Sequence, residues 1–216
     1  VDAIMFCLGD GRTFLHDSQV GEVWGDNVEK WAHSVFQRAG RNVRNLIDQG
    51  DDPLRIICDR AREHGIQIYA TLIVNQVSGE RGVDMRGSNF RFDNKHLDIG
   101  AAGDLDPDFA GASCADFKHE EIRTERLEII EETLSKYPLD GLELQMSYPP
   151  YYHFHPNEVD EGRSIMTGWI GQVYEAVKRS GAERELAVCV PVNTQDCLDA
   201  GLDPEEWIRQ GTVDAL

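Results

Sequence analysis

Hydrophobic and polar positions along the chain follow two periods, one typical of strands and one of helices. Runs of apolar, β-branched residues that end in polar, Gly or Pro positions are typical of buried strands. These runs are Val1 to Leu8, Ile66 to Val74, Gly141 to Met146 and Leu186 to Val192, and a fifth begins at Val213. The pattern therefore predicts four strands and the start of another.

Between these runs, apolar residues recur at helical spacing. The predicted helices are Pro53 to His64, His119 to Tyr137, Gly162 to Arg179 and Pro204 to Gln210. The last opens with Asp203 as an N-cap and with proline at its first position, where a proline is well tolerated. Alternation of strands and helices is typical of βαβ units and a parallel sheet, so the sequence predicts an α/β fold of the parallel β/α barrel type.

The length of the chain bounds this prediction. The chain has 216 residues, whereas a complete eight-stranded barrel needs roughly 250. It begins inside one apolar run and stops inside another, Thr212 to Leu216. We therefore expect residues 1–216 to form one domain, a partial barrel cut at both ends. Localisation stays open, and it would be periplasmic or extracellular if a signal peptide preceded Val1.

The connections that follow the strands are much longer than those that precede them. Asn75 to Lys118 is rich in Gly, Asp and Asn, and Ser147 to Glu161 is aromatic and proline-rich. In a β/α barrel the connections after the strands form the carboxyl-terminal face, where active sites lie. Long connections at that face indicate that they form a ligand-binding surface.

Composition and charge exclude several functions. Lys and Arg number 21 against 39 Asp and Glu, a net charge of −18, so the chain should repel nucleic acid and anionic lipid surfaces. No apolar run is long enough to span a membrane. A Gly-x-Gly pattern at Leu8 to Arg12 lacks the third glycine and the helix of a phosphate-binding loop. The oligomeric state is not indicated.

The cysteines do not predict a metal site. Cys7, Cys58 and Cys189 lie in apolar runs, where buried thiols are expected, and Cys114 and Cys197 lie in loop-like sequence. No pair has zinc-ligand spacing, so we expect no metal and no cofactor. A disulfide between the two loop cysteines is left open.

The strand that begins at Gly141 carries the strongest candidate chemistry. Its period of two places leucines on one face and Glu143, Gln145 and Ser147 on the other, which should point into the barrel. A carboxylate held there against a ligand can act as a general acid or base. The alternative is that Glu143 is a structural carboxylate paired with an arginine or lysine lower in the barrel.

Side chains suited to sugars surround this strand. The loop after it contains Tyr148, Tyr151, Tyr152, His153 and His155. Aromatic rings can stack on sugar rings, while hydroxyl and imidazole groups supply hydrogen bonds; the alternative is an aromatic plug in the barrel mouth. We expect the two histidines to form walls rather than to bind a metal.

Amide side chains end two neighbouring strands. Asn75 and Gln76 follow one strand, and Asn193 and Gln195 follow another. Neutral amides both donate and accept hydrogen bonds, which suits hydroxyl-rich ligands, although they also cap strands and turns.

Several segments resemble one family in the same order. His119 to Arg123 with Tyr137 to Leu144, Arg62 to Ala70, and Gly201 to Trp207 with Asp214 resemble the glycosyl-hydrolase-like barrels of the family-10-like group, a type abundant in planctomycete-like bacteria. The resemblance implies a (β/α)8 TIM barrel of which about strands 2 to 6 are present.

It also implies a carbohydrate-active protein whose carboxylate after strand four is a general acid/base. A second carboxylate, the nucleophile, would come from a later strand beyond Leu216 and would lie about 5 Å away in a retaining enzyme. The chain departs from the family pattern, because Gln145 and Ser147 stand where Asp and Arg are usual and Gln76 stands where Asp follows Asn. These departures weaken the case for catalysis relative to binding.

The sequence therefore predicts a glycoside-hydrolase-like barrel that acts on a polysaccharide or oligosaccharide. Glu143 is the candidate catalytic residue, and the candidate ligand contacts are Asn75, Gln145, Tyr148, Tyr151, Tyr152, His155 and Asn193. A non-catalytic carbohydrate-binding barrel is the first alternative. A metal-dependent sugar isomerase or lyase is the second, for which only Asp10, Glu143 and the loop histidines offer ligands.

Overall fold

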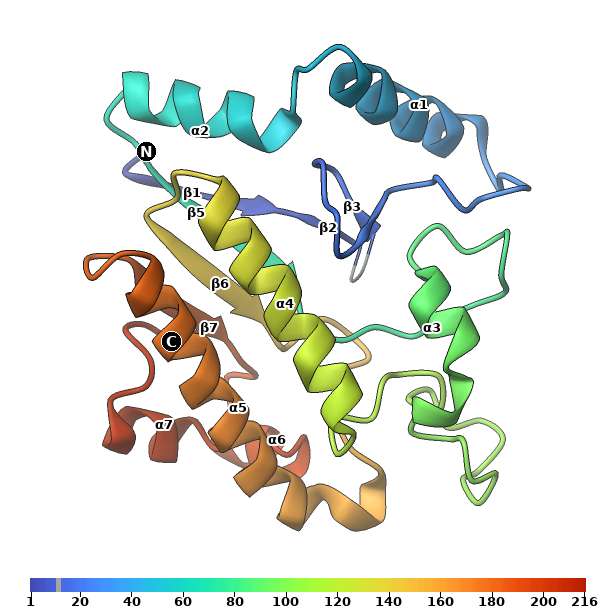
Figure 1. Cartoon of the computed structure of the whole chain (residues 1–216). Helices are drawn as coiled ribbons and strands as arrows, with labels where there is room; N and C mark the ends of the chain where they lie inside the picture. The colour runs from blue at the N-terminus through green and yellow to red at the C-terminus, as the bar shows by residue number, and fades with distance from the viewer. Residues whose placement is uncertain (11–12) are drawn as a thin grey trace.

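A four-stranded parallel sheet forms the centre of the computed structural model, which describes residues 1–10 and 13–216 (Figure 1). Its strands, in the order β1-β5-β6-β7, are Ala3–Cys7, Gln67–Ile73, Gly141–Gln145 and Glu185–Cys189. Ala215 forms a parallel bridge with Ala187, so the fifth apolar run lies against the free edge of β7. The predicted α/β class and parallel sheet are confirmed, and the sheet is open within these residues.

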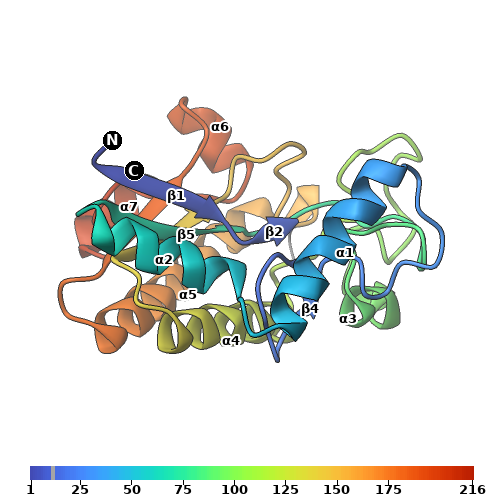
Figure 2. The same ribbon diagram turned by 90° about the horizontal axis from the view of Figure 1, so that it is seen from above.

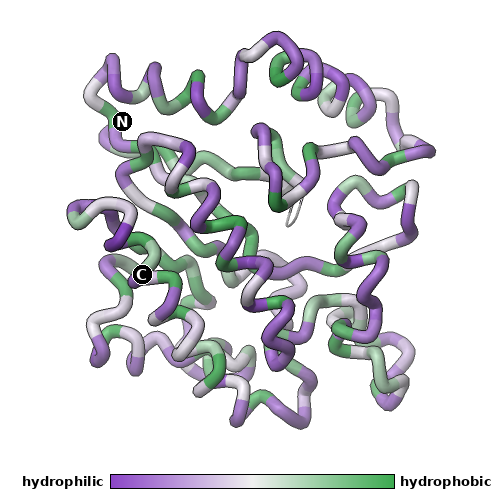
Figure 3. The backbone as a smooth tube through the Cα atoms, viewed as in Figure 1, coloured by the Kyte–Doolittle hydropathy of each residue, from purple (hydrophilic) through white to green (hydrophobic). Residues whose placement is uncertain are grey.

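Helices connect the strands as the apolar periodicity predicts. The four predicted helices are confirmed as α2 (Pro53–Glu63), α4 (Glu120–Lys136), α5 (Val159–Ser180) and α7 (Pro204–Gln210). The side chain of Asp203 caps α7 by accepting from the Glu206 amide at 3.0 Å. Hydrophobic and hydrophilic residues alternate around the helices (Figure 3).

One face of the sheet is covered by α2, α4 and α5, which lie on the same side of the strands in both ribbon views (Figures 1 and 2). The residues of β5 and β6 that point toward these helices, such as Ile68, Leu72 and Leu144, are at most 2% exposed. Trp169 of α5 and Trp207 of α7 join the same core. Alternation along each strand then places the intervening residues on the other face of the sheet.

Several short elements lie outside the predicted set. They are β2 (Gly9–Asp10), β3 (Thr13–Phe14), β4 (Glu22–Val23), α1 (Ser34–Asp48), α3 (Asn89–Asp93), α6 (Thr194–Asp199) and the 3-10 helices Lys95–Leu97 and Pro156–Glu158. The three short strands form a second sheet, in which β3 pairs antiparallel with β2 and parallel with β4. Of the Gly-x-Gly pattern, Gly11 and Arg12 lie outside the described residues. Both α1 and α3 lie beyond the carboxyl ends of the main strands (Figure 1).

The cysteines differ from expectation in two places. Cys7 is exposed and Cys189 is half-buried, because both side chains lie on the face of the sheet that the helices leave uncovered. The two loop cysteines, Cys114 and Cys197, are buried free thiols, so no disulfide joins them. None of the helices in the described part of the chain is long and apolar enough to cross a membrane.

Candidate functional site

The uncovered face of the sheet carries a polar row at its centre. Strand register places Cys7, Thr71, Glu143 and Ala187 side by side on β1, β5, β6 and β7. The next row toward the carboxyl ends contains Gln145 and Cys189. Leu142, Leu144 and Met146 are buried on the opposite face. The predicted division of β6 into an apolar and a polar face is therefore confirmed.

Glu143 is held by one neighbour. The Thr71 hydroxyl donates a short hydrogen bond to Glu143 Oε2 across the β5–β6 pair. The Glu143 side chain is half-buried, and no lysine, arginine or histidine of the described residues forms an ion pair with it. The structural alternative, a carboxylate neutralised by a base, thus has no partner among residues 1–10 and 13–216. The carboxylate lies on an accessible polar face with one oxygen fixed.

Gln145 and Ser147 extend the row. Gln145 Oε1 accepts from the Ser147 amide at 3.1 Å and from its hydroxyl at 2.9 Å, and the hydroxyl oxygen lies 3.4 Å from Cys189 Sγ. The amide oxygen of Gln145 already accepts two hydrogen bonds from Ser147. Its NH₂ group is therefore the part of the side chain that could donate to a ligand.

A second carboxylate, Glu185, lies on the same face but at the amino end of β7. Its Oε2 accepts a short hydrogen bond from the Tyr69 hydroxyl, and burial together with this carboxylate raises the Tyr69 pKa to about 12. The Tyr69 ring occupies the space above Gly141, where any Cβ would overlap it. In a β/α barrel the amino ends of strands are the stability face, so this pair forms a floor below Glu143. The alternation Gln67, Tyr69, Thr71 in β5 is the sequence signal that would have identified it.

Asn75 organises the loops above the sheet. Its Nδ2 donates to the carbonyl oxygens of Ala115 at 2.7 Å and Tyr152 at 2.8 Å, and its Oδ1 accepts from the amides of Ala115 and Gln76, both at 3.0 Å. Asn75 is 3% exposed. Its amide is therefore fully used in tying both long loops to the end of β5.

The neighbouring Gln76 is the second amide at the end of β5. It is 8% exposed, and within the described part of the chain neither its Oε1 nor its Nε2 has a hydrogen-bond partner. A buried amide without partners is costly, and such groups usually have a functional or solvent-mediated explanation.

The three tyrosines of the loop after β6 have different environments. Tyr148 and Tyr152 are 44% and 37% exposed, whereas Tyr151 packs against the core. The ring centroids of Tyr152 and Phe109 lie 4.6 Å apart, and the Tyr152 ring also covers Gly111. The exposed rings are therefore Tyr148 and Tyr152, and the Tyr152 ring packs on Phe109 and Gly111.

The two histidines of this loop are both buried. His153 is buried edge-on against Phe117, its Nε2 lies 3.3 Å from the Met146 carbonyl oxygen, and burial lowers its pKa to about 4. His155 Nδ1 accepts from the Asn157 amide at 3.2 Å, and its Nε2 lies 3.4 Å from Asp104.

Asn193 lies after β7 and is exposed. Its Oδ1 accepts from the Gln195 amide at 2.8 Å, which caps the N-terminus of α6. Its NH₂ group faces away from that cap and has no described partner. In the described residues no group of three His, Cys, Asp or Glu side chains is placed to hold a metal ion.

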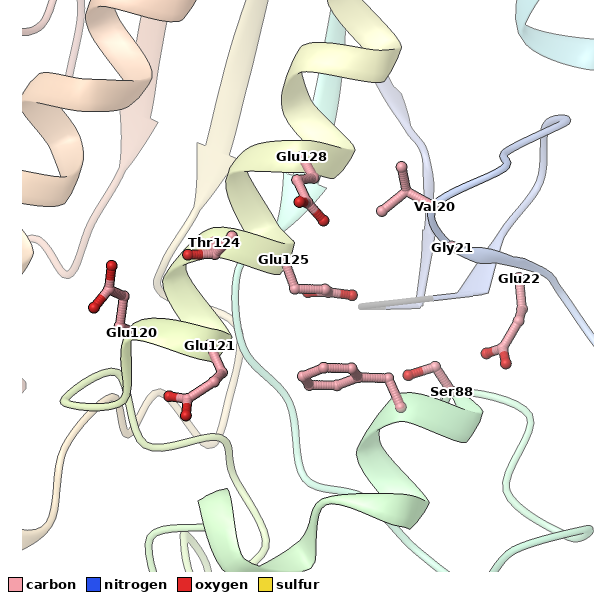
Figure 4. A pocket seen from close by; sticks show the side chains of 10 residues that line it. Val20, Gly21, Glu22, Ser88, Glu120, Glu121, Thr124, Glu125 and Glu128 are labelled. Carbon is pink, nitrogen blue, oxygen red and sulfur yellow. The ribbon is translucent and has the colours of Figure 1, made fainter.

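A cavity of about 610 Å³ lies apart from this row, between α3, α4 and the β3–β4 connection (Figure 4). Phe90, Ser88 and Thr124 line it together with five glutamates. Those glutamates are Glu22, Glu120, Glu121, Glu125 and Glu128. Because Glu22 accepts hydrogen bonds from the Asn89 amide, part of this charge serves to dock α3 against the small sheet.

Comparison with known proteins supports the fold. No protein-family model and no curated protein matches the sequence. Among solved structures, α-L-fucosidase isoenzyme 2 from Paenibacillus thiaminolyticus is similar over 94% of this chain and 29% of its own, with 12% identity and a TM-score of 0.53. This chain thus spans less than a third of the fucosidase. The likeness shows that the fold of this chain is similar to part of the fold of that fucosidase.

Two further solved structures match with lower TM-scores. A cycloisomaltooligosaccharide glucanotransferase from Paenibacillus sp. matches over 75% of this chain and 23% of its own, with 12% identity and a TM-score of 0.47. The GH36 α-galactosidase AgaA from Geobacillus stearothermophilus matches over 63% and 18%, with 13% identity and a TM-score of 0.43.

Proposed function

We propose that the chain is part of a (β/α)8 barrel, spanning residues 1–216, that acts on a polysaccharide or oligosaccharide by general acid/base catalysis. The observation that supports this most is Glu143. It lies on the uncovered polar face of a parallel sheet, one oxygen is fixed by Thr71, and no base of the described residues neutralises it. The fold likeness to an α-L-fucosidase agrees with this assignment.

In the proposed reaction Glu143 donates a proton to the glycosidic oxygen as the bond to the leaving sugar breaks. A glycosidase of this type needs a second carboxylate as nucleophile or base. Glu185 is a poor candidate, because its carboxylate is engaged by Tyr69 at the floor of the sheet. The partner would come from outside residues 1–216.

We assign sugar contacts to side chains at the carboxyl ends of the strands. Gln145 and Asn193 each have an NH₂ group available for sugar hydroxyls, and Tyr148 and Tyr152 present exposed rings for stacking. Tyr151, Asn75 and His155 would act indirectly, by holding the loops that carry these contacts in position.

The test is hydrolysis of a panel of oligosaccharides by the full-length protein and by two matched variants. Glu143→Gln removes the acid while keeping the shape, and loss of a general acid typically lowers turnover about 100-fold or more. Glu185→Gln changes a carboxylate on the same face and should leave turnover within a few-fold of wild type.

Each outcome decides between functions. Unchanged turnover in Glu143→Gln would remove this residue from the mechanism. Saturable sugar binding without hydrolysis by the wild type would favour a carbohydrate-binding barrel. The amide of Gln145, which cannot transfer a proton, is compatible with this alternative. Isomerisation or elimination of a sugar that is abolished by a chelator would instead favour a metal-dependent isomerase or lyase.

A further inference from the structure

A separate cavity of about 320 Å³ lies between α1 and the connection that follows β4. Trp24 and Trp31 line it, together with the polar side chains of Asp26, Gln37, Arg41 and Arg44. Its volume is at the lower end of the range for ligand pockets, about 300–1,000 Å³. In both ribbon views α1 lies beyond the carboxyl end of β1 (Figures 1 and 2), and the cavity is lined by no residue of the row that contains Glu143.

The indole of Trp31 is fixed in position by two glycines. A Cβ at Gly25 would overlap its ring, and a Cβ at Gly40 would lie 2.9 Å from its Cη2 atom. Gly25 has φ +88°, a conformation that glycine adopts most easily. Gly40 is the buried residue of α1, so this helix is docked against Trp31 rather than into the main core.

Two further aromatic rings, those of Trp24 and Phe36, form a cluster with the Trp31 indole. The centroids of Trp24 and Trp31 are 6.0 Å apart, and Phe36 packs edge-on against Trp24 at 6.2 Å. Trp24 is 7% exposed, whereas Trp31 is only half-buried. The cavity therefore has a rigid aromatic wall that is partly open to solvent.

The rim of the cavity has local positive charge in a chain whose net charge is −18. Arg44 is occupied, because its Nε and Nη2 both donate to the Asp26 carboxylate. Arg41 forms no ion pair or hydrogen bond with any described residue. One guanidinium is thus left beside the aromatic wall without an anionic partner, and a planar guanidinium favours carboxylate or sulfate groups.

We propose that this cavity is a second binding site, which takes a saccharide unit bearing a carboxylate or sulfate group. The apolar face of the sugar would rest on Trp31, Gln37 would bond its hydroxyls, and Arg41 would bind the anion. This combination of an apolar wall and a few convergent polar groups is what defines a ligand pocket. The site shares a ligand class with the proposed function but uses none of its residues.

The test is calorimetric titration in a Glu143→Gln background, so that hydrolysis plays no part. The probes are a trigalacturonate, a sulfated trisaccharide, a neutral cellotriose and inorganic sulfate. Saturable binding of one of the two anionic saccharides is expected, with cellotriose and inorganic sulfate at least tenfold weaker. The first two probes distinguish a carboxylate from a sulfate as the preferred group.

Three variants locate the binding. Arg41→Gln should weaken binding about tenfold or more, the effect of losing a charge-assisted hydrogen bond. Gly40→Ala should do the same by displacing Trp31, while alanine favours the helix and so preserves α1. Arg38→Gln, which changes an exposed arginine of α1 outside the cavity, should bind within twofold of the parent.

The proposal is overturned by any of three results. These are no saturable binding of either anionic saccharide, equal affinity for the neutral trisaccharide or for inorganic sulfate, and unchanged binding by Arg41→Gln. Because every measurement is made without hydrolysis, failure here leaves the role of Glu143 untouched, and inactivity of the wild type leaves this site untouched.

Discussion

Thr71 and Glu143 face each other across the β5–β6 pair, and the threonine hydroxyl donates to the glutamate carboxylate. We expect Thr71→Val to lower glycan turnover by up to about tenfold, because the Glu143 carboxyl group loses the hydrogen bond that fixes one of its oxygens, which is worth roughly 0.5–1.5 kcal/mol. Thr71→Ser keeps the hydroxyl and should restore most of the activity. Steady-state kinetics of both variants measure this. Equal loss of activity in both would show that the methyl group, not the hydrogen bond, matters.

Asn75 should be a stability residue. Asn75→Ala removes four hydrogen bonds to buried main-chain groups and should lower the free energy of unfolding by about 2–4 kcal/mol. The control is Asn193→Ala, which removes one exposed helix cap and should cost only about 1 kcal/mol. Urea unfolding compares the two. A smaller effect at Asn75 than at Asn193 would show that the loops are held by other contacts.

Gly141 should not tolerate a side chain. A Cβ there would overlap the Tyr69 ring and lie 2.5 Å from the Glu185 carbonyl oxygen, so Gly141→Ala should destabilise the fold by about 2 kcal/mol through overpacking. At Gly168, on the exposed side of α5, no atom lies within 4 Å of an added Cβ, and alanine should stabilise the helix by about 0.5–1 kcal/mol. Thermal unfolding of both variants should therefore shift in opposite directions.

His153 should make stability depend on pH. Burial lowers its pKa from 6.5 to about 4, so between these values the unfolded state binds more protons than the folded state. Stability is therefore full above pH 6.5 and is lost as the pH falls toward 4, by about 3 kcal/mol. His153→Gln cannot titrate and should show a correspondingly smaller loss from pH 7 to pH 4 in urea unfolding. His64→Gln, at an exposed histidine, should follow the wild type; an identical pH dependence in all three proteins would contradict the assignment.

The main strands and helices could be predicted from the sequence because each buries one regular apolar stripe. Helix α1 could not, because it contains Gly40, Asn42 and Asn45, which are poor helix formers. Its one buried residue is a glycine that lies against the Trp31 indole, so no stripe of large buried residues marks the helix. The short strands β2 to β4 have two residues each, too few to show a period.

The polar face of β6 was predictable, since a period of two separates Glu143 and Gln145 from the leucines. The environment of each site residue was not. Asn75 is bonded to residues 40 and 77 positions away, contacts that no local pattern encodes. The exposure of Cys7 depends on which face the helices cover, and an apolar run such as Val1 to Leu8 does not distinguish its two faces.

The register of the central sheet runs without interruption from β1 through β5 and β6 to β7, although the connections between these strands differ widely in length. The neighbours of Glu143 on the sheet are thus specified by strand pairing alone. The scaffold of Glu143 is therefore made by main-chain pairing between strands, whereas the loops at the carboxyl ends form the more variable part of a β/α barrel.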